Sequence, residues 1–373
     1  MKSYRFQWKT ACYPAPAIFA GLLMAQLIAT FQVYFSNRSL YHTFTNIGEA
    51  GYFMVPHQKA MGNLLELTAA LCGGLFLTMS MGAGICLLSF TAAWVWDRIF
   101  FRKTGFLFLG FLIWAGLAGG INWSGFSPFG SLYVLAIPPV VVAGVLKWIP
   151  NGDGKNLRRT GLLQTIPIIV LGLLWAPQMK NDLFHQIRDH LLRTNPLGEK
   201  IVDFYYCYTL YAAEAIRSLD QKLLKTYRMD SSGNEIQFKG ELKKILSDNN
   251  WIETKKLQSV DLVLSFSVNE ILLKDLTDTI LKVPKSEFLS HPAAALKQFS
   301  SLTDRNRFFR QLTFYSLLIG FPITLYIFLY SFFFYLVGRW LPPGRGAFLS
   351  ATLCFCTALV CLITLWLNNA KIF

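Results

Sequence analysis

The closest grouping of histidine and carboxylate side chains in the sequence is His185, Asp189 and His190. On a helix, His185 and Asp189 share a face, but His190 points about 100° away from Asp189. A helical zinc site instead requires two histidines four positions apart. The group is therefore typical of a solvated helix face, and the sequence predicts neither a metal site nor a catalytic residue.

Other signatures of chemistry are also missing from the sequence. It contains no P-loop, dinucleotide-binding fingerprint, G-x-S-x-G elbow or H-E-x-x-H motif. Its 7 cysteines are scattered, most of them within apolar segments, so they predict neither a disulfide framework nor a zinc site. We expect no cofactor and lean away from an enzyme. An envelope enzyme acting on a lipid-linked substrate is the third alternative, with four candidate residues near the outer interface: Glu66, His57, His185 and Asp189.

The most unusual run of side chains is aromatic and lies between residues 204 and 211. Asn195 and Pro196 are expected to cap and begin the helix that carries it, which we expect to reach about Arg228. Core packing or contact with the membrane surface would explain the run, and a partner-binding face is the alternative. Four residues form the predicted partner-binding face: Tyr205, Tyr206, Tyr208 and Tyr211.

The composition indicates a membrane protein. Apolar residues make up 53% of the chain and charged residues only 15%, whereas a soluble domain has about 25% charged residues. The net charge is +14, but the polar block 177–311 holds 20 Lys/Arg against 17 Asp/Glu. The excess positive charge therefore lies in short loops and at the ends of apolar segments, which argues against a nucleic-acid partner.

Seven apolar segments have about the length of a transmembrane helix. Their approximate ranges are 17–35, 66–96, 105–121, 130–149, 161–176, 312–337 and 347–367. The sequence thus predicts a mainly α, polytopic protein in a 5 + 2 arrangement. An N-terminal membrane domain (1–176) and a C-terminal hairpin (312–373) flank one α+β domain (177–311).

The charges of the short connecting segments predict the orientation of the chain. With the N-terminus inside, the inner segments hold 12 Lys/Arg, and the outer segments 36–65, 122–129 and 368–373 hold 3. Lysine and arginine are enriched on the cytoplasmic side. We therefore predict a multi-pass protein of the plasma (inner) membrane with a cytoplasmic N-terminus. Residues 177–311 would be extracytoplasmic, which in a bacterium means periplasmic.

Local patterns predict further elements. Helices are expected over 181–193, 240–248, 269–281 and 293–310, the last running directly into the sixth span. Strands are expected near 251 and over 260–266. Residues 36–65 read as a polar connection, and Pro138 and Pro139 should kink or break the fourth span. Gly116 and Gly120 form a small-residue pair that suits packing within the chain as well as dimerisation.

The spans carry no Asp, Glu, Lys, Arg or His except Glu66 and Lys147, each near an edge. Ion-coupled transporters, proton relays and intramembrane proteases use such residues at membrane depth. The leading hypothesis is therefore a non-catalytic scaffold, accessory subunit or assembly factor, whose exported domain binds a membrane or periplasmic protein in addition to the lipid bilayer. The alternative is a non-ion-coupled permease or channel component that uses the proline-broken helices.

Overall fold

The computed structural model describes residues 14–49, 62–100, 102–148, 154–175, 196–230, 236–254, 260–267, 269–276 and 278–370. The long helices are α2 (Pro14–Glu49), α4 (Leu67–Leu77), α5 (Ala83–Arg98), α6 (Thr104–Ile121), α7 (Pro128–Trp148), α8 (Gly154–Trp175), α14 (Arg307–Val337) and α15 (Pro343–Ala370). The elements between α8 and α14 are α10 (Pro196–Ala212), β1 (Lys225–Met229), α11 (Ile236–Asp248), β2 (Trp251–Glu253), β3 (Leu262–Phe266), β4 (Glu270–Asp275), β5 (Asp278–Pro284), α12 (Lys285–Ser290) and α13 (Pro292–Leu302).

Six helices in the described residues are long and apolar enough to cross a bilayer. They are Pro14–Glu49, Leu67–Arg98, Thr104–Ile121, Pro128–Lys147, Arg307–Val337 and Gly344–Thr364. The protein is therefore a multi-pass membrane protein, and these helices confirm six of the predicted spans. The remaining predicted span, 161–176, falls in α8, whose apolar part Gln164–Leu174 is shorter.

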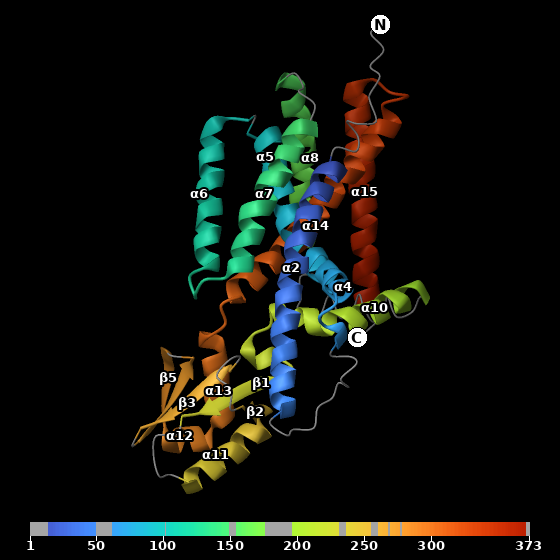
Figure 1. The fold of residues 1–373 in the computed structure, drawn as a ribbon. Coiled ribbons are helices and arrows are strands. Elements are labelled where there is room, and N and C mark those ends of the chain that lie inside the picture. The colour runs from blue at the N-terminus through green and yellow to red at the C-terminus, as the bar shows by residue number, and fades with distance from the viewer. Residues whose placement is uncertain are drawn as a thin grey trace.

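The long helices stand side by side, and the sheet lies beyond one end of the bundle (Figure 1). We call this end the domain end and the opposite end the far end. The α6–α7 turn, the C-terminal end of α2 and α10 lie at the domain end. The α5–α6 and α14–α15 turns lie at the far end, together with the start of α8.

The first helix, α2, extends well beyond the predicted span 17–35. It continues to Glu49, so the expectation of a polar connection from residue 36 was wrong for residues 36–49. The buried side chains of this extension recur at helical spacing: Asn37, Leu40, Phe44 and Ile47. One side of the extension is therefore packed against the protein, which favours helix although the segment is only moderately apolar.

The second span contains a π-helical turn, Thr78–Gly82, between α4 and α5. The side chain of Gln26 on α2 meets this turn, since Thr78 Oγ1 donates to Gln26 Oε1 at 2.8 Å. Pro138 and Pro139 were predicted to kink or break the fourth span, and α7 is not broken, because it runs through both prolines as one helix. Proline removes one backbone donor, and a membrane helix tolerates this loss where its neighbours pack closely.

The sheet has the strand order β2-β1-β3-β4-β5. β1 pairs in parallel with β2 and β3, whereas β3, β4 and β5 are antiparallel neighbours. Leu264 and Leu273 of the strands share a core with Leu246 of α11 and Phe299 of α13. The sheet and its helices therefore form one mixed α/β core, distinct from the core of the membrane bundle.

Two predictions for this region were wrong. Residues 269–281, expected as a helix, form the β4–β5 hairpin, whose turn includes Leu276 with a φ of 54°. The helix expected to reach Arg228 ends at Ala212, and Lys225–Met229 is the strand β1. The strands β1 and β4 both pair with β3, which buries Tyr227 in β1 and Ile271 and Leu273 in β4, and this tertiary burial outweighs local helix propensity.

The helices α5 and α14 approach each other through glycines. A Cβ atom added to Gly84 would lie 2.5 Å from the carbonyl oxygen of Thr313, and one added to Gly320 would lie 2.8 Å from the Leu87 Cβ. Because α14 follows directly from the domain that holds the sheet, this contact ties that domain to the centre of the bundle.

Candidate functional site

The described residues contain no group of three or more His, Cys, Asp or Glu that could hold a metal ion. His57, His185, Asp189 and His190 lie outside the described residues. Glu66 is described: its carboxylate accepts a hydrogen bond from Thr68 Oγ1 at 3.1 Å and is exposed. No catalytic arrangement is built around it.

The helix α10 crosses the domain end of the bundle (Figure 1). Of the predicted partner-binding residues, Tyr211 is half-buried and packs with Leu40, Phe44, Leu64 and Leu224. Burial raises the pKa of the Tyr211 phenol. Tyr211 therefore helps to fix α10 against the extension of α2.

The side chains of the other three predicted residues, Tyr205, Tyr206 and Tyr208, lie outside the described set, although their backbone belongs to α10. Their assignment to a partner-binding face stays a prediction.

Arg310, in the first turn of α14, makes the central polar contact between the sheet-containing domain and the bundle. Its Nη1 and Nη2 atoms bind the two carboxylate oxygens of Asp304 at 3.0 Å and 2.5 Å. Nη1 also donates to the carbonyl oxygen of Ile216 at 2.6 Å. The Asp304 side chain is only 8% exposed. Arg310 thereby joins three segments of the chain. A largely buried, bidentate ion pair links it to Asp304, and a hydrogen bond links it to the segment that contains Ile216.

The expected continuous helix from residue 293 into the sixth span was wrong at this point. α13 ends at Leu302 and α14 begins at Arg307, and Asp304 lies in the break between them. The break turns the chain and allows the Asp304 carboxylate to bind Arg310 in the next helix.

The α6–α7 loop is docked on the same junction. The Asn122 side chain accepts a hydrogen bond from the Ser127 backbone at 3.0 Å, and Ser127 Oγ donates to Asn306 Oδ1 at 3.0 Å. Gly125 has a φ of +122°, and its Cα packs against the aliphatic part of Arg305. We call the set Ser127, Ile216, Asp304, Asn306 and Arg310 the neck.

The extension of α2 adds a third attachment. Gln32 Nε2 donates to the Ala215 carbonyl oxygen at 3.5 Å, and Asn37 Nδ2 donates to that of Leu64 at 3.2 Å. Together with the packing of Tyr211, these contacts connect α2, the start of α4 and the segment after α10. The domain is therefore held at several points rather than by a single tether.

A second polar group lies inside the bundle, where α8, α14 and α15 meet. Tyr326, Tyr330 and Cys354 are buried together, and the Gln164 side chain lies next to the Tyr330 hydroxyl. Neither tyrosine hydroxyl makes a hydrogen bond of normal geometry with the described residues. We call these four residues the tyrosine cluster. Unpaired polar groups are costly in hydrocarbon, so water or a polar ligand would stabilise them.

No family model, no curated protein and no solved structure matches this chain. Its function must therefore be argued from the geometry of the chain itself.

The sequence analysis did not identify the neck. Ile216 and Arg310 are 94 positions apart, and Ser127 and Asn306 are 179 apart. The local signal for the neck was the presence of Asp304 and Arg310 shortly before the apolar segment that begins at Leu312. Opposite charges so close to the start of a span indicate an ion pair at the membrane surface.

Proposed function

We propose that this protein is a non-catalytic membrane scaffold, accessory subunit or assembly factor whose sheet-containing domain binds a membrane or periplasmic protein. The observation that carries the proposal is the multiple attachment of that domain to the bundle through the neck, the docked α6–α7 loop and the extension of α2. A domain held in this way presents its surface at a fixed height and orientation above the membrane. Because such a surface is already ordered, less conformational entropy is lost when a partner binds to it.

We further propose seven crossings of the plasma (inner) membrane, with the N-terminus cytoplasmic and the domain end extracytoplasmic. The far end holds Arg98, Arg102 and Lys103 beside the α5–α6 turn and Arg339 beside the α14–α15 turn, whereas the α6–α7 loop has no charge. α8 begins at the far end, and α10 lies at the domain end (Figure 1). If α8 also crosses, successive connections lie on opposite sides of the membrane. The positively charged connections then lie together on the cytoplasmic side, in agreement with the positive-inside rule.

The aromatic run of α10 is the proposed docking surface, with Tyr205, Tyr206 and Tyr208 as the predicted contact residues. Aromatic side chains dominate the binding energy of many protein interfaces. Ile201, near the start of the same helix, is 57% exposed.

The proposal predicts different effects of two tyrosines of α10. Tyr205→Ala should lower the recovery of a stoichiometric partner from native membranes at least about fivefold at a normal protein level, because aromatic residues often dominate binding energy. Tyr211→Ala should lower the protein level instead, because Tyr211 packs with Leu40 and Phe44 of α2. The measurement is purification in mild detergent followed by quantitative mass spectrometry. Full partner recovery with Tyr205→Ala and Tyr208→Ala, or no partner at all, would contradict the proposal.

A non-ion-coupled permease or channel component is the second candidate, and the tyrosine cluster favours it. Its buried tyrosine hydroxyls lie beside α8, which contains Pro167, and on α14, which contains Pro322. Helices interrupted by proline line substrate sites in several transporter folds. Loss of solute flux in reconstituted vesicles on Gln164→Leu, with partner recovery unchanged, would favour this function over the scaffold.

A further inference from the structure

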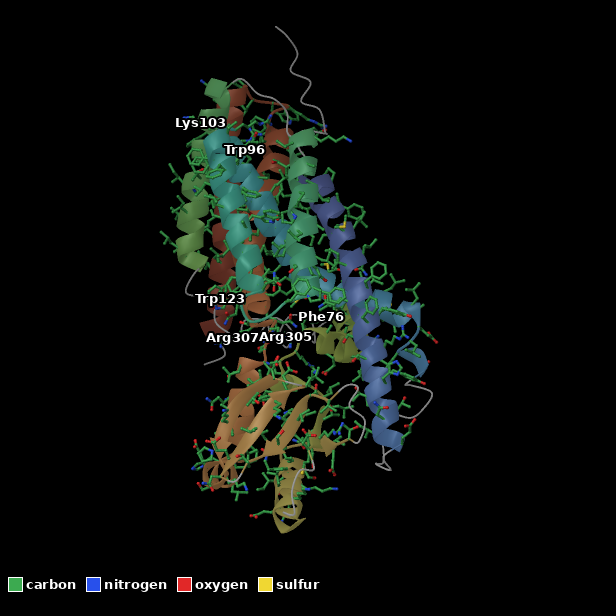
Figure 2. The ribbon with its side chains drawn as sticks, turned by 60° about the vertical axis from the view of Figure 1, so that its left-hand side comes forward. Phe76, Trp96, Lys103, Trp123, Arg305 and Arg307 are labelled. Carbon is green, nitrogen blue, oxygen red and sulfur yellow. The ribbon has the colours of Figure 1, made fainter. Side chains whose placement is uncertain are left out.

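An exposed patch of aromatic and basic side chains lies where the sheet-containing domain meets the bundle. It consists of Trp123 and Phe126 in the α6–α7 loop, Arg305 just before α14 and Arg307 at its start, and we call it the Trp123 patch. Trp123 is 90% exposed and Phe126 is 71% exposed. Figure 2 shows Trp123, Arg305 and Arg307 close together at the junction.

The two parts of the patch are fixed relative to each other. Gly125, between the two aromatic residues, packs against the aliphatic part of Arg305, and a Cβ atom there would lie 3.2 Å from Arg305 Cδ. The hydrogen bond from Ser127 to Asn306 closes the same contact from the other side. The loop that carries the exposed rings is therefore held against the segment that carries the two arginines.

The patch lies at the edge of the apolar surface of the bundle. Immediately after Arg307, Phe308 is 39% exposed, and Tyr315 and Ile319 follow on the lipid-facing side of α14 with exposures of 57% and 48%. Arg307 thus marks the depth at which hydrocarbon gives way to the headgroup layer, where Trp and Arg are favoured.

The equivalent residues at the far end are engaged with their own chain. Trp96 Nε1 donates to the Lys103 carbonyl oxygen at 3.2 Å, and Arg98 and Arg102 both bind Asp97. Figure 2 shows Trp96 and Lys103 at that end.

At the Trp123 patch, Arg305 gives one nitrogen to Asp275 at 2.7 Å. Arg307 makes no ion pair with any residue in the described part of the chain. The patch therefore keeps hydrogen-bond donors and positive charge that the described residues of the chain do not neutralise.

We propose that the Trp123 patch binds the phosphate-bearing headgroup of an anionic phospholipid in the leaflet at the domain end. Arg305 and Arg307 would donate to the phosphate oxygens, and Trp123 and Phe126 would lie among the glycerol and upper acyl groups. Because both arginines adjoin the neck, the bound lipid would stabilise the domain in its position on the bundle. This inference does not depend on the proposed partner.

The test is native mass spectrometry of the full chain, released from nanodiscs that contain equal amounts of phosphatidylglycerol and phosphatidylcholine. The wild type should retain phosphatidylglycerol preferentially. Arg307→Gln should lower that retention about fivefold, and Arg305→Gln combined with Arg307→Gln should lower it further, since each basic residue near an anionic surface contributes about that factor. The matched control is Lys103→Gln, which removes one exposed positive charge at the far end.

Equal retention of the two lipids, no change in the arginine variants, or an equal loss in Lys103→Gln would each overturn the proposal. Soluble glycerol phosphate serves as a competitor, and displacement of the lipid by glycerol phosphate at a matched concentration would show a site for free phosphate esters instead. Trp123→Ala provides an independent check. It should reduce retention while leaving the thermal stability of the protein unchanged, because the Trp123 side chain is almost fully exposed.

Discussion

Replacement of Arg310 by alanine is expected to destabilise the folded protein by about 3 kcal/mol or more. The change leaves the Asp304 carboxylate, with a side chain only 8% exposed, without the guanidinium that binds both of its oxygens. It also leaves the Ile216 carbonyl oxygen without its donor. The loss should be measured as a lower midpoint of thermal unfolding for the purified protein in detergent.

The matched control for this prediction is Arg307→Ala, three positions earlier in the same helix. Arg307 is exposed and pairs with no residue in the described part of the chain, so its loss should change stability by less than about 0.5 kcal/mol in a neutral lipid or detergent. Arg310→Lys should be intermediate, because lysine keeps the charge but cannot bind both oxygens in one plane. An Arg310→Ala protein as stable as Arg307→Ala would show that the neck does not hold the domain.

The second large effect is expected from Gly84→Ala, which should destabilise the bundle by about 1–3 kcal/mol. The new methyl group would lie 2.5 Å from the Thr313 carbonyl oxygen, a backbone atom that cannot turn away. The helices α5 and α14 would have to separate. The fraction of protein that remains monodisperse after a fixed heating step in detergent should fall accordingly.

Gly116→Ala is the control for the glycine prediction. Gly116 lies in α6, and a Cβ atom there would meet nothing within 4 Å. Alanine is also the better helix former by about 1 kcal/mol, so this variant should be as stable as the wild type or slightly more stable. Equal behaviour of the Gly84→Ala and Gly116→Ala proteins would refute close contact between α5 and α14.

These glycines also show how far the sequence could be interpreted. Gly116 and Gly120 were predicted as a pair, but among the described residues only Gly120 meets a neighbour from another helix, the Phe308 ring. Gly84 and Gly320 carry a close contact between α5 and α14, although no short motif relates them. Their roles depend on which helices are neighbours, and a single sequence does not give that information.

The apolar segments were predictable because long runs without charge must be helical in a bilayer. The six helices that confirm them follow from this rule alone. The extension of α2 was not predictable in the same way. Residues 36–49 are of mixed polarity, and the side chains that cover Leu40 and Phe44 come from Leu64, Tyr211 and Leu224, far along the chain.

In the region of the sheet, too, one element was predictable from the sequence and another was not. The strand β3 was predicted, because Leu262, Val263 and Leu264 form a short apolar run that is buried throughout. The β4–β5 hairpin was predicted as a helix, since its register is determined by pairing with β3 rather than by its own pattern. The neck joins residues from three separate regions, so only the folded chain identifies it as a candidate site.

The most direct test of the account is the sidedness of three single cysteines in a variant that lacks the 7 native ones. Cysteine would replace Lys103 at the far end, Phe126 in the α6–α7 loop and Lys282 in β5, and intact cells would be treated with a thiol reagent that does not cross membranes. With the domain end extracytoplasmic, we expect labelling at positions 126 and 282, and labelling at position 103 only after the membrane is opened. Labelling of positions 103 and 282 from the same side would contradict it.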